Sequence, residues 1–282
     1  MLMPMLMRDN VDISLRGNSG KTHLVKSTGD TEPVILLHGL GGSGLEIILP
    51  FHVLTRLTLI APDRPGYGAS DTLEVKPGPR AQAAWLKELL DKLGIDRAIV
   101  VAHSIAAATA LAFGAANPTR VKGLILLAPF CRPTPEATVP VLRAANLPFV
   151  GLLVRHALAL GASWFGDYAL RRALATDRLP FWLNDFPTAH LAHVKSWQTR
   201  AAELRAFNAD MISLGKVAAP CHVIAARGDT IADIAWHVAW LAQHCPGMTM
   251  ELLPGSGHCP HHTMPLVVSA AAQQFASLWS RH

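Results

Sequence analysis

Short apolar runs alternate with longer helical patterns over two parts of the chain. The strand-like runs cover residues 33–39, 57–63, 98–102, 121–129, 221–229 and 248–258. The helical patterns cover residues 79–94, 105–116 and 231–244, and a last one extends to about residue 280. Because the runs are apolar on both faces, the pattern predicts a mostly parallel sheet with helices on both sides. Two earlier runs, 11–16 and 22–27, predict an opening hairpin.

The alternation stops between residues 131 and 215. This segment contains helical stretches, prolines and large aromatic side chains, but no strand-like run. The simplest arrangement is one sheet domain, formed by residues 1–130 and 216–282, with a helical insertion at 131–215.

Composition supports a large core and narrows the class of protein. Hydrophobic residues make up 50% of the 282 residues and charged residues only 16%, which argues against a disordered chain. The net charge is +5, but lysine and arginine are scattered along the chain. They form no basic cluster of the kind that binds nucleic acid, so we expect no nucleic-acid partner.

Membrane insertion and export are also not expected. The most apolar interior segment, 146–166, has Arg155 and His156 at its centre, where charge is costly in a bilayer. The Met-rich start has no basic leader or cleavage site of a signal peptide. We therefore expect a cytoplasmic protein whose four cysteines are buried thiols.

A serine lies at a junction between a strand and a helix. Ser104 follows the run 98–102 and precedes the Ala-rich helix 105–116. In parallel sheets, ligands bind at the carboxyl ends of strands. A serine in a sharp turn there exposes its hydroxyl, and the small residues Ala102 and Ala106 allow the helix to pack against the strand. The alternative is that Ser104 only caps the helix.

The five residues around Ser104, Ala-His-Ser-Ile-Ala, resemble the nucleophile elbow Gly-x-Ser-x-Gly of the α/β-hydrolase family, with alanine at both glycine positions. The segment 36–44, Leu-Leu-His-Gly-Leu-Gly-Gly-Ser-Gly, resembles the oxyanion loop of that family. The resemblance implies a loop built on His38 and Gly39 and an oxyanion hole formed by the backbone N–H groups of Leu40 and Ile105.

Two later loops resemble those that carry the other members of the family's catalytic triad. The segment 225–233 places Asp229 at the position of the acid, and the segment 253–262 places His258 at that of the histidine. The order Ser104, Asp229, His258 is the one expected for this fold. The loop 61–71 also resembles a family loop, in which Asp63 and Arg64 have structural roles.

Other residues compete for these roles. Asp233 is a rival acid, although it falls near the start of a helix, where acids are favoured. His258, His261 and His262 could suggest a metal site. However, they match no zinc-binding spacing, and adjacent histidines diverge on a helix, so we expect no metal and no cofactor.

The resemblance implies a serine hydrolase that cleaves small carboxylic esters with an apolar acyl or alcohol part. Trp164 and Trp182 of the insertion are expected to line the substrate pocket, unless they only form the core of the insertion. The same triad serves lactonases, C–C bond hydrolases and perhydrolases, and a ligand-binding protein of this fold is a further alternative. Dehalogenases and epoxide hydrolases are disfavoured, because those families have an aspartate at the elbow.

Overall fold

This computed structural model describes most of the chain. The described residues are 8–15, 20–27, 29, 32–51, 57–134, 140–145, 147–175, 180–183 and 194–279. Within them, no helix is long and apolar enough to cross a membrane.

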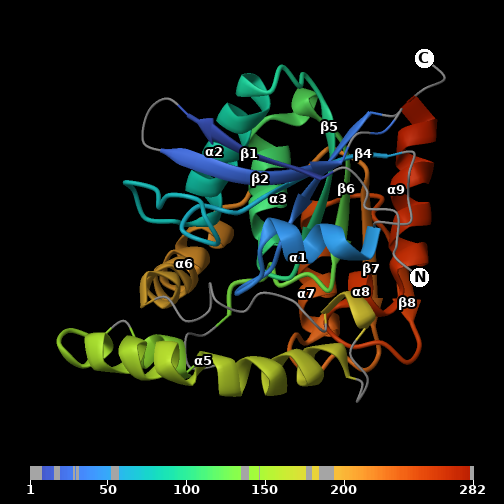
Figure 1. Ribbon diagram of the computed structural model, residues 1–282. Coiled ribbons are helices and arrows are strands. Elements are labelled where there is room, and N and C mark those ends of the chain that lie inside the picture. Colours follow the sequence, from blue (N-terminus) through green and yellow to red (C-terminus); the bar gives the residue numbers. More distant parts are fainter. Residues whose placement is uncertain are drawn as a thin grey trace.

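A single sheet forms the centre of the described structure (Figure 1). Its strands are β1 (Arg8–Ser14), β2 (Lys21–Ser27), β3 (Pro33–Leu37), β4 (Thr58–Pro62), β5 (Ala98–His103), β6 (Val121–Leu127), β7 (Cys221–Ala226) and β8 (Thr249–Leu253). Their order is β1-β2-β4-β3-β5-β6-β7-β8. The β1–β2 and β2–β4 pairs are antiparallel and the other pairs are parallel. The opening hairpin and the mostly parallel sheet predicted from the sequence are confirmed.

Helices cover both faces of this sheet (Figure 1). They are α1 (Gly44–Ile48), α2 (Pro79–Lys92), α3 (Ala106–Ala116), α4 (Pro140–Ala145), α5 (Val150–Leu174), α6 (Val194–Ile212), α7 (Ile234–His244), α8 (Pro260–Thr263) and α9 (Pro265–Trp279). Alternate residues of one strand enter two different cores, as period-two geometry requires. Val100 of β5 packs with α2 and α3, whereas Val101 packs with α1 and α9.

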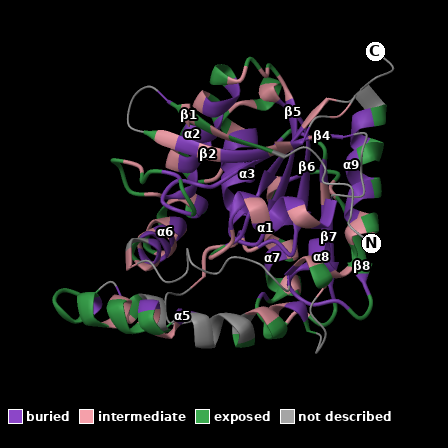
Figure 2. Cartoon of the chain, in the orientation of Figure 1, coloured by how far each residue is buried: buried purple, intermediate pink, exposed green. Residues whose placement is uncertain are grey.

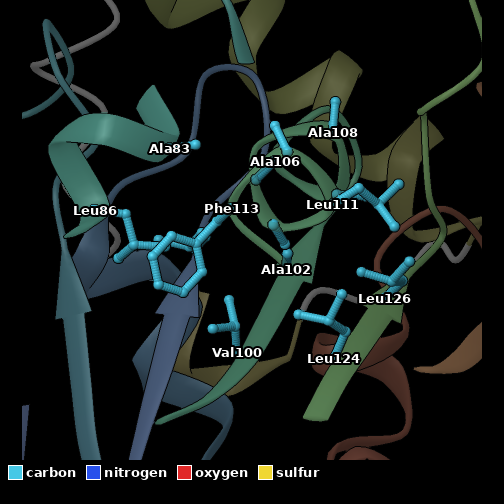
Figure 3. Packing of buried hydrophobic residues seen from close by; sticks show 14 of the residues in the cluster. Ala83, Leu86, Val100, Ala102, Ala106, Ala108, Leu111, Phe113, Leu124 and Leu126 are labelled. Carbon is cyan, nitrogen blue, oxygen red and sulfur yellow. The ribbon is translucent and has the colours of Figure 1, made fainter. Parts of the chain in front are cut away.

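Helix α3 is buried along almost its whole length. Figure 3 shows Phe113 and Leu111 of this helix facing Val100 and Leu126 of the sheet, and Ala106 and Ala108 belong to the same buried cluster. Alanine allows the helix axis to approach the strands closely, which explains why the segment is Ala-rich and has no polar face. This close packing fixes the start of α3 directly beyond the end of β5.

The described part of 131–215 is helical and contains no strand. Helix α4 contacts α5 and α6, α5 also contacts α8, and α6 also contacts α2 and α3. Helix α5 runs along the lower edge of the molecule in Figure 1, and Figure 2 shows that much of it is exposed. The division of the chain into a core domain and an inserted domain stays a prediction.

Candidate active site

Ser104 occupies a strained turn directly after β5. Its φ of 55° lies in the left-handed region, which costs a residue other than glycine about 1–3 kcal/mol. Three backbone hydrogen bonds hold it there: its N–H donates to the oxygen of Leu127 at 2.9 Å, and its oxygen accepts from the N–H groups of Phe130 and Ala107, each at 3.0 Å. Ile105, not Ser104, is the N-cap residue of α3, so the capping interpretation is wrong.

Three side chains from separate loops form a continuous hydrogen-bonded chain. His258 Nε2 lies 2.8 Å from Ser104 Oγ, and His258 Nδ1 lies 2.8 Å from Asp229 Oδ2. Because Nδ1 faces a carboxylate, it carries the proton, and the lone pair of Nε2 faces the serine hydroxyl. The structure therefore brings together the three residues singled out in the sequence.

Asp229 is held in its ionised form by its surroundings. Its Oδ1 accepts hydrogen bonds from the N–H groups of Ile231 at 2.8 Å and Ala232 at 3.0 Å. Burial by itself would raise the pKa of this carboxyl group, but the hydrogen bond to His258 and the two backbone N–H groups outweigh burial and lower the pKa.

The loop that carries His258 is held on two sides. The backbone N–H of His258 donates to the oxygen of Ala173, in the last turn of α5, at 2.6 Å. Its own oxygen accepts a hydrogen bond from His103 Nε2 at 2.8 Å. A side chain at Gly257 would overlap the oxygen of Ala173, at 2.4 Å, so this close approach requires glycine. The end of α5 thus helps to position the imidazole.

The glycine-rich loop 39–42 lies against the serine. A Cβ atom at Gly39 would lie 2.7 Å from His103 Nδ1 and 3.2 Å from Ser104 Cβ, so only glycine fits. The N–H of Gly42 donates to the oxygen of Gly39 at 3.2 Å and closes a tight turn around Leu40. Ile105, at the start of α3, belongs to a helix end whose first N–H groups have no intrahelical acceptor.

His38 anchors this loop to its neighbour. Its Nδ1 donates to the oxygen of Gly39 at 2.9 Å, and its Nε2 accepts from the backbone N–H of Arg64 at 2.9 Å. The Arg64 guanidinium also donates to the oxygen of His38 at 2.8 Å. His38 is therefore a neutral imidazole that shapes the loop. Asp63 contributes through backbone contacts, with its Oδ1 2.7 Å from the N–H of Gly44.

A buried ion pair connects this loop region to helix α6. Glu203 and Arg64 pair with almost no exposure of either side chain. The Glu203 carboxylate also accepts hydrogen bonds from Tyr67 Oη at 2.5 Å and Gln82 Nε2 at 2.9 Å. Sequence reasoning identified Arg64 but missed Glu203, because no local pattern distinguishes a glutamate of α6 that turns inward.

Asp233, the rival acid, has a different role. It is the N-cap residue of α7, and its Oδ1 accepts from the N–H of Trp236 at 3.0 Å. Since its carboxylate caps a helix, it is not the partner of His258.

His261 and His262 share a buried carboxylate that the sequence reasoning did not find. Glu46 Oε1 lies 3.0 Å from His261 Nε2 and 2.5 Å from His262 Nε2. The expectation that adjacent histidines diverge is wrong here, because α8 is only one turn long and both rings reach back to α1. Among the described residues, the ligand atoms of these three side chains lie close enough together, within 4.8 Å of one another, for the group to be a possible metal site.

Hydrogen bonding accounts for this group without a metal ion. Trp182 Nε1 donates to His262 Nδ1 at 3.1 Å, which places the ring proton on Nε2, facing Glu46. A metal ligand would need the lone pair of that same Nε2 atom. Burial raises the pKa of Glu46, but the hydrogen bonds from both histidines hold it well below its usual value.

Of the two tryptophans that the sequence predicts to line the substrate pocket, the structure describes the side chain of only one. The side chain of Trp164 lies outside the described residues. Trp182 is half-buried and contacts His262 rather than Ser104. One hollow, of about 860 Å³, is lined by Asp229 and Ile231 but by neither Ser104 nor His258.

The four cysteines are buried free thiols, as expected from the sequence. With the site geometry in hand, comparison with known proteins identifies the family. Residues 32–265 match the alpha/beta hydrolase fold family. The chain therefore belongs to this family, and it is a hydrolase of the α/β-hydrolase superfamily.

Relatives agree with this assignment but differ in what they act on. An uncharacterized protein of Mycobacterium tuberculosis (strain ATCC 25618 / H37Rv) is 27% identical over 275 residues, 90% of this chain and 77% of that protein. A 2-hydroxy-6-oxo-6-phenylhexa-2,4-dienoate hydrolase of Burkholderia cepacia is 35% identical over 127 residues, 42% of this chain and 44% of that one. A thermophilic esterase of Thermogutta terrifontis has a TM-score of 0.72 at 22% identity, over 95% and 97% of the two chains, and supports the fold alone.

Proposed function

We propose that this protein is a serine hydrolase that cleaves small carboxylic esters through an acyl-enzyme intermediate. The observation that carries the proposal is the unbroken chain of hydrogen bonds from Asp229 through His258 to Ser104, with 2.8 Å at each contact of the imidazole. A serine hydroxyl is a poor nucleophile by itself, and a neutral imidazole at this distance can accept its proton.

In the first half of the reaction, Ser104 Oγ bonds to the ester carbonyl carbon while His258 Nε2 takes the hydroxyl proton. The ionised Asp229 stabilises the resulting imidazolium and holds its orientation. Collapse of the tetrahedral intermediate breaks the bond to the alcohol oxygen, which receives the proton from His258. In the second half, a water molecule attacks the acyl-enzyme by the same proton transfers and releases the acid.

The negative charge on the carbonyl oxygen needs donors near Ser104. The backbone N–H groups of Leu40 and Ile105 would supply them. Support comes from the contact of Gly39 with Ser104 and from the position of Ile105 at the start of α3. In enzymes that have been measured, losing one such donor costs about 3–4 kcal/mol of transition-state stabilisation.

The insertion is proposed as the second wall of the substrate site. The end of α5 contacts the His258 loop through Ala173, and α6 contacts the Arg64 loop through Glu203. A cap in contact with both loops would enclose an acyl or alcohol part of modest size, at about 0.8 kcal/mol for each buried methylene group.

Turnover of short p-nitrophenyl esters tests this function. We expect hydrolysis by the wild type, its loss in Ser104→Ala, and labelling of Ser104 alone by a fluorophosphonate. Ser269→Ala is the matched control, because Ser269 is also buried but lies in α9. An adduct on a different serine, or ester turnover that persists in Ser104→Ala, would refute the assignment.

Cleavage of a C–C bond is the second candidate, favoured by the relative from Burkholderia cepacia. That hydrolase acts on a dienoate with a 6-oxo group, and the same triad could serve such a reaction. The Asn-Ser-Met-Gly elbow that we associate with C–C bond hydrolases is absent here, where the elbow is His-Ser-Ile-Ala. Parallel assays with the dienoate and with esters discriminate the two candidates.

A further inference from the structure

Helix α6 directs a second buried arginine toward the loop beside Ser104. Arg200 is only 4% exposed. A Cβ atom at Gly41 would lie 3.3 Å from the Arg200 Cζ atom and 3.4 Å from Nη2, so the guanidinium packs on the backbone of the turn 39–42. Gly41 directly follows Leu40, a proposed oxyanion donor. The cation therefore lies one residue from the place where a substrate carbonyl would bind.

Arg64 forms an ion pair with Glu203, whereas Arg200 forms none at salt-bridge distance among the described residues, although the charge of Glu203 acts on it from farther away. Both oxygens of Glu203, the nearest acid along the helix, accept hydrogen bonds from Arg64, Tyr67 and Gln82. Arg200 Nε and Nη2 are buried and form no hydrogen bond. The guanidinium also packs over the ring of Trp197, with Cζ 4.3 Å from the ring centroid.

The two unpartnered nitrogens lie on the same edge of the guanidinium plane. An Nε–H and an Nη2–H on that edge donate in parallel, in a geometry that matches the two oxygens of one carboxylate. Leaving such donors buried and unsatisfied is costly, so an unfilled edge of this kind indicates a missing acceptor. Burial also lowers the pKa of Arg200, although an arginine remains protonated at neutral pH.

A second unsatisfied donor lies one helical turn away. Ser196 is buried, and its Oγ forms no hydrogen bond. Residues four apart share a face of a helix, so the Ser196 hydroxyl and the Arg200 guanidinium point to the same side of α6. Gly41 is partly exposed and Leu40 is exposed, so the turn on which Arg200 packs reaches the surface.

We propose that Arg200, assisted by Ser196, binds a carboxylate group of the substrate, so that this hydrolase acts on esters of dicarboxylic acids or similar anionic acyl compounds. This proposal rests on the proposed function for the position of the reacting carbonyl, but the anion site itself does not require turnover. The acyl group would lie between Ser104 and Arg200, with its carbonyl oxygen at the N–H of Leu40 and its carboxylate on the guanidinium.

Matched methyl esters test the specificity. Monomethyl succinate and monomethyl glutarate carry the carboxylate, whereas methyl pentanoate has a similar length without charge. We expect the ratio of kcat/KM for the charged over the neutral ester to fall about 10- to 100-fold in Arg200→Met, because a charge-assisted bidentate contact is lost. Arg200→Lys should keep part of the preference, and Ser196→Ala should lower it less than Arg200→Met.

Arg205→Met is the matched control, because Arg205 is exposed on the same helix. It should keep the wild-type preference. Circular dichroism and the Tm of each variant show whether it folds, and Arg200→Lys provides a test if Arg200→Met does not. Equal ratios in the wild type, Arg200→Lys and Arg200→Met would overturn the proposal.

Succinate binding tests the anion site at Arg200 independently of ester hydrolysis at Ser104. Calorimetric titration of the inactive Ser104→Ala protein should show succinate binding that is lost when Arg200→Met is added. Equal binding by both proteins, or none, overturns the anion site even where neutral esters are cleaved. Binding that depends on Arg200, without turnover of any ester, supports the anion site and refutes ester hydrolysis.

Discussion

This protein contains two buried carboxylate–imidazole groups whose histidines, His258 and His262, are neighbours in the sequence. In one, Asp229 contacts His258, whose second nitrogen faces the Ser104 hydroxyl. In the other, Glu46 contacts His262, whose second nitrogen accepts a hydrogen bond from Trp182. The acids and the imidazoles are alike, but the last partner differs. An imidazole whose free lone pair faces a hydroxyl can act as a base, whereas one that faces an N–H donor cannot accept a further proton there.

The largest expected difference between the two groups is in catalysis. Asp229→Asn should lower kcat by roughly 10³- to 10⁴-fold while the protein stays folded, because the amide favours the wrong tautomer of His258. Ester hydrolysis under saturating substrate measures the effect.

Asp233→Asn is the control for this substitution. Asparagine caps a helix as well as aspartate does, so the variant should keep both Tm and kcat. If Asp233→Asn abolishes hydrolysis and Asp229→Asn does not, the acid has been assigned to the wrong residue.

The second difference appears in the dependence of stability on pH. Burial, reinforced by the neighbouring His262, lowers the pKa of His261 from 6.5 to about 4. The folded state therefore binds fewer protons than the unfolded state between these values. The free energy of unfolding should fall as pH drops from about 6.5 to about 4, by on the order of 3 kcal/mol for this residue.

Urea unfolding at pH 7, 5.5 and 4.5 measures this loss. His261→Gln should show a shallower pH dependence, and His156→Gln, at an exposed position of α5, should keep the wild-type dependence. A free energy of unfolding that is constant over this range would contradict the effect. Below about pH 4.5, protonation of Glu46 and Asp229, whose pKa values are lowered in the fold, should reduce stability further.

The smallest expected effect concerns Glu46 itself. Glu46→Gln should lower the free energy of unfolding by about 1–3 kcal/mol, because the two hydrogen bonds that Oε1 accepts from His261 and His262 lose the charge of the carboxylate in a buried site. Its effect on kcat should be far smaller than that of Asp229→Asn. Glu251→Gln, at an exposed position of β8, is the matched control for Tm. A fall in kcat as large as that of Asp229→Asn would show that the two groups are not separate in function.

Local sequence predicted the elements around Ser104 well. The short, continuous apolar run of β5 and the Ala-rich α3 predicted the strand, the helix and their junction, because burial on both faces of a strand appears directly as an unbroken run of apolar residues. It could not decide whether Ser104 caps the helix. That depended on the positive φ of Ser104, which a short polar cluster does not specify.

Residues of the predicted insertion are harder to interpret. Trp182 was expected at the substrate, yet its indole contacts His262, and the acyl-pocket role of Trp164 and Trp182 stays a prediction. Aromatic residues in a helical segment indicate burial, but the sequence does not specify which surface they are buried against.

The sequence by itself determined the class of fold, the order of the loops that carry Ser104, Asp229 and His258, and the buried state of the thiols. These features depend on local periodicity and on short segments that resemble a known family. The tertiary structure alone decided the partners of the buried charges. Glu46 meets His261 across 215 positions, and Glu203 meets Arg64 across 139. A buried charge must be paired wherever the fold provides a partner, and nothing in the local sequence records where that partner lies.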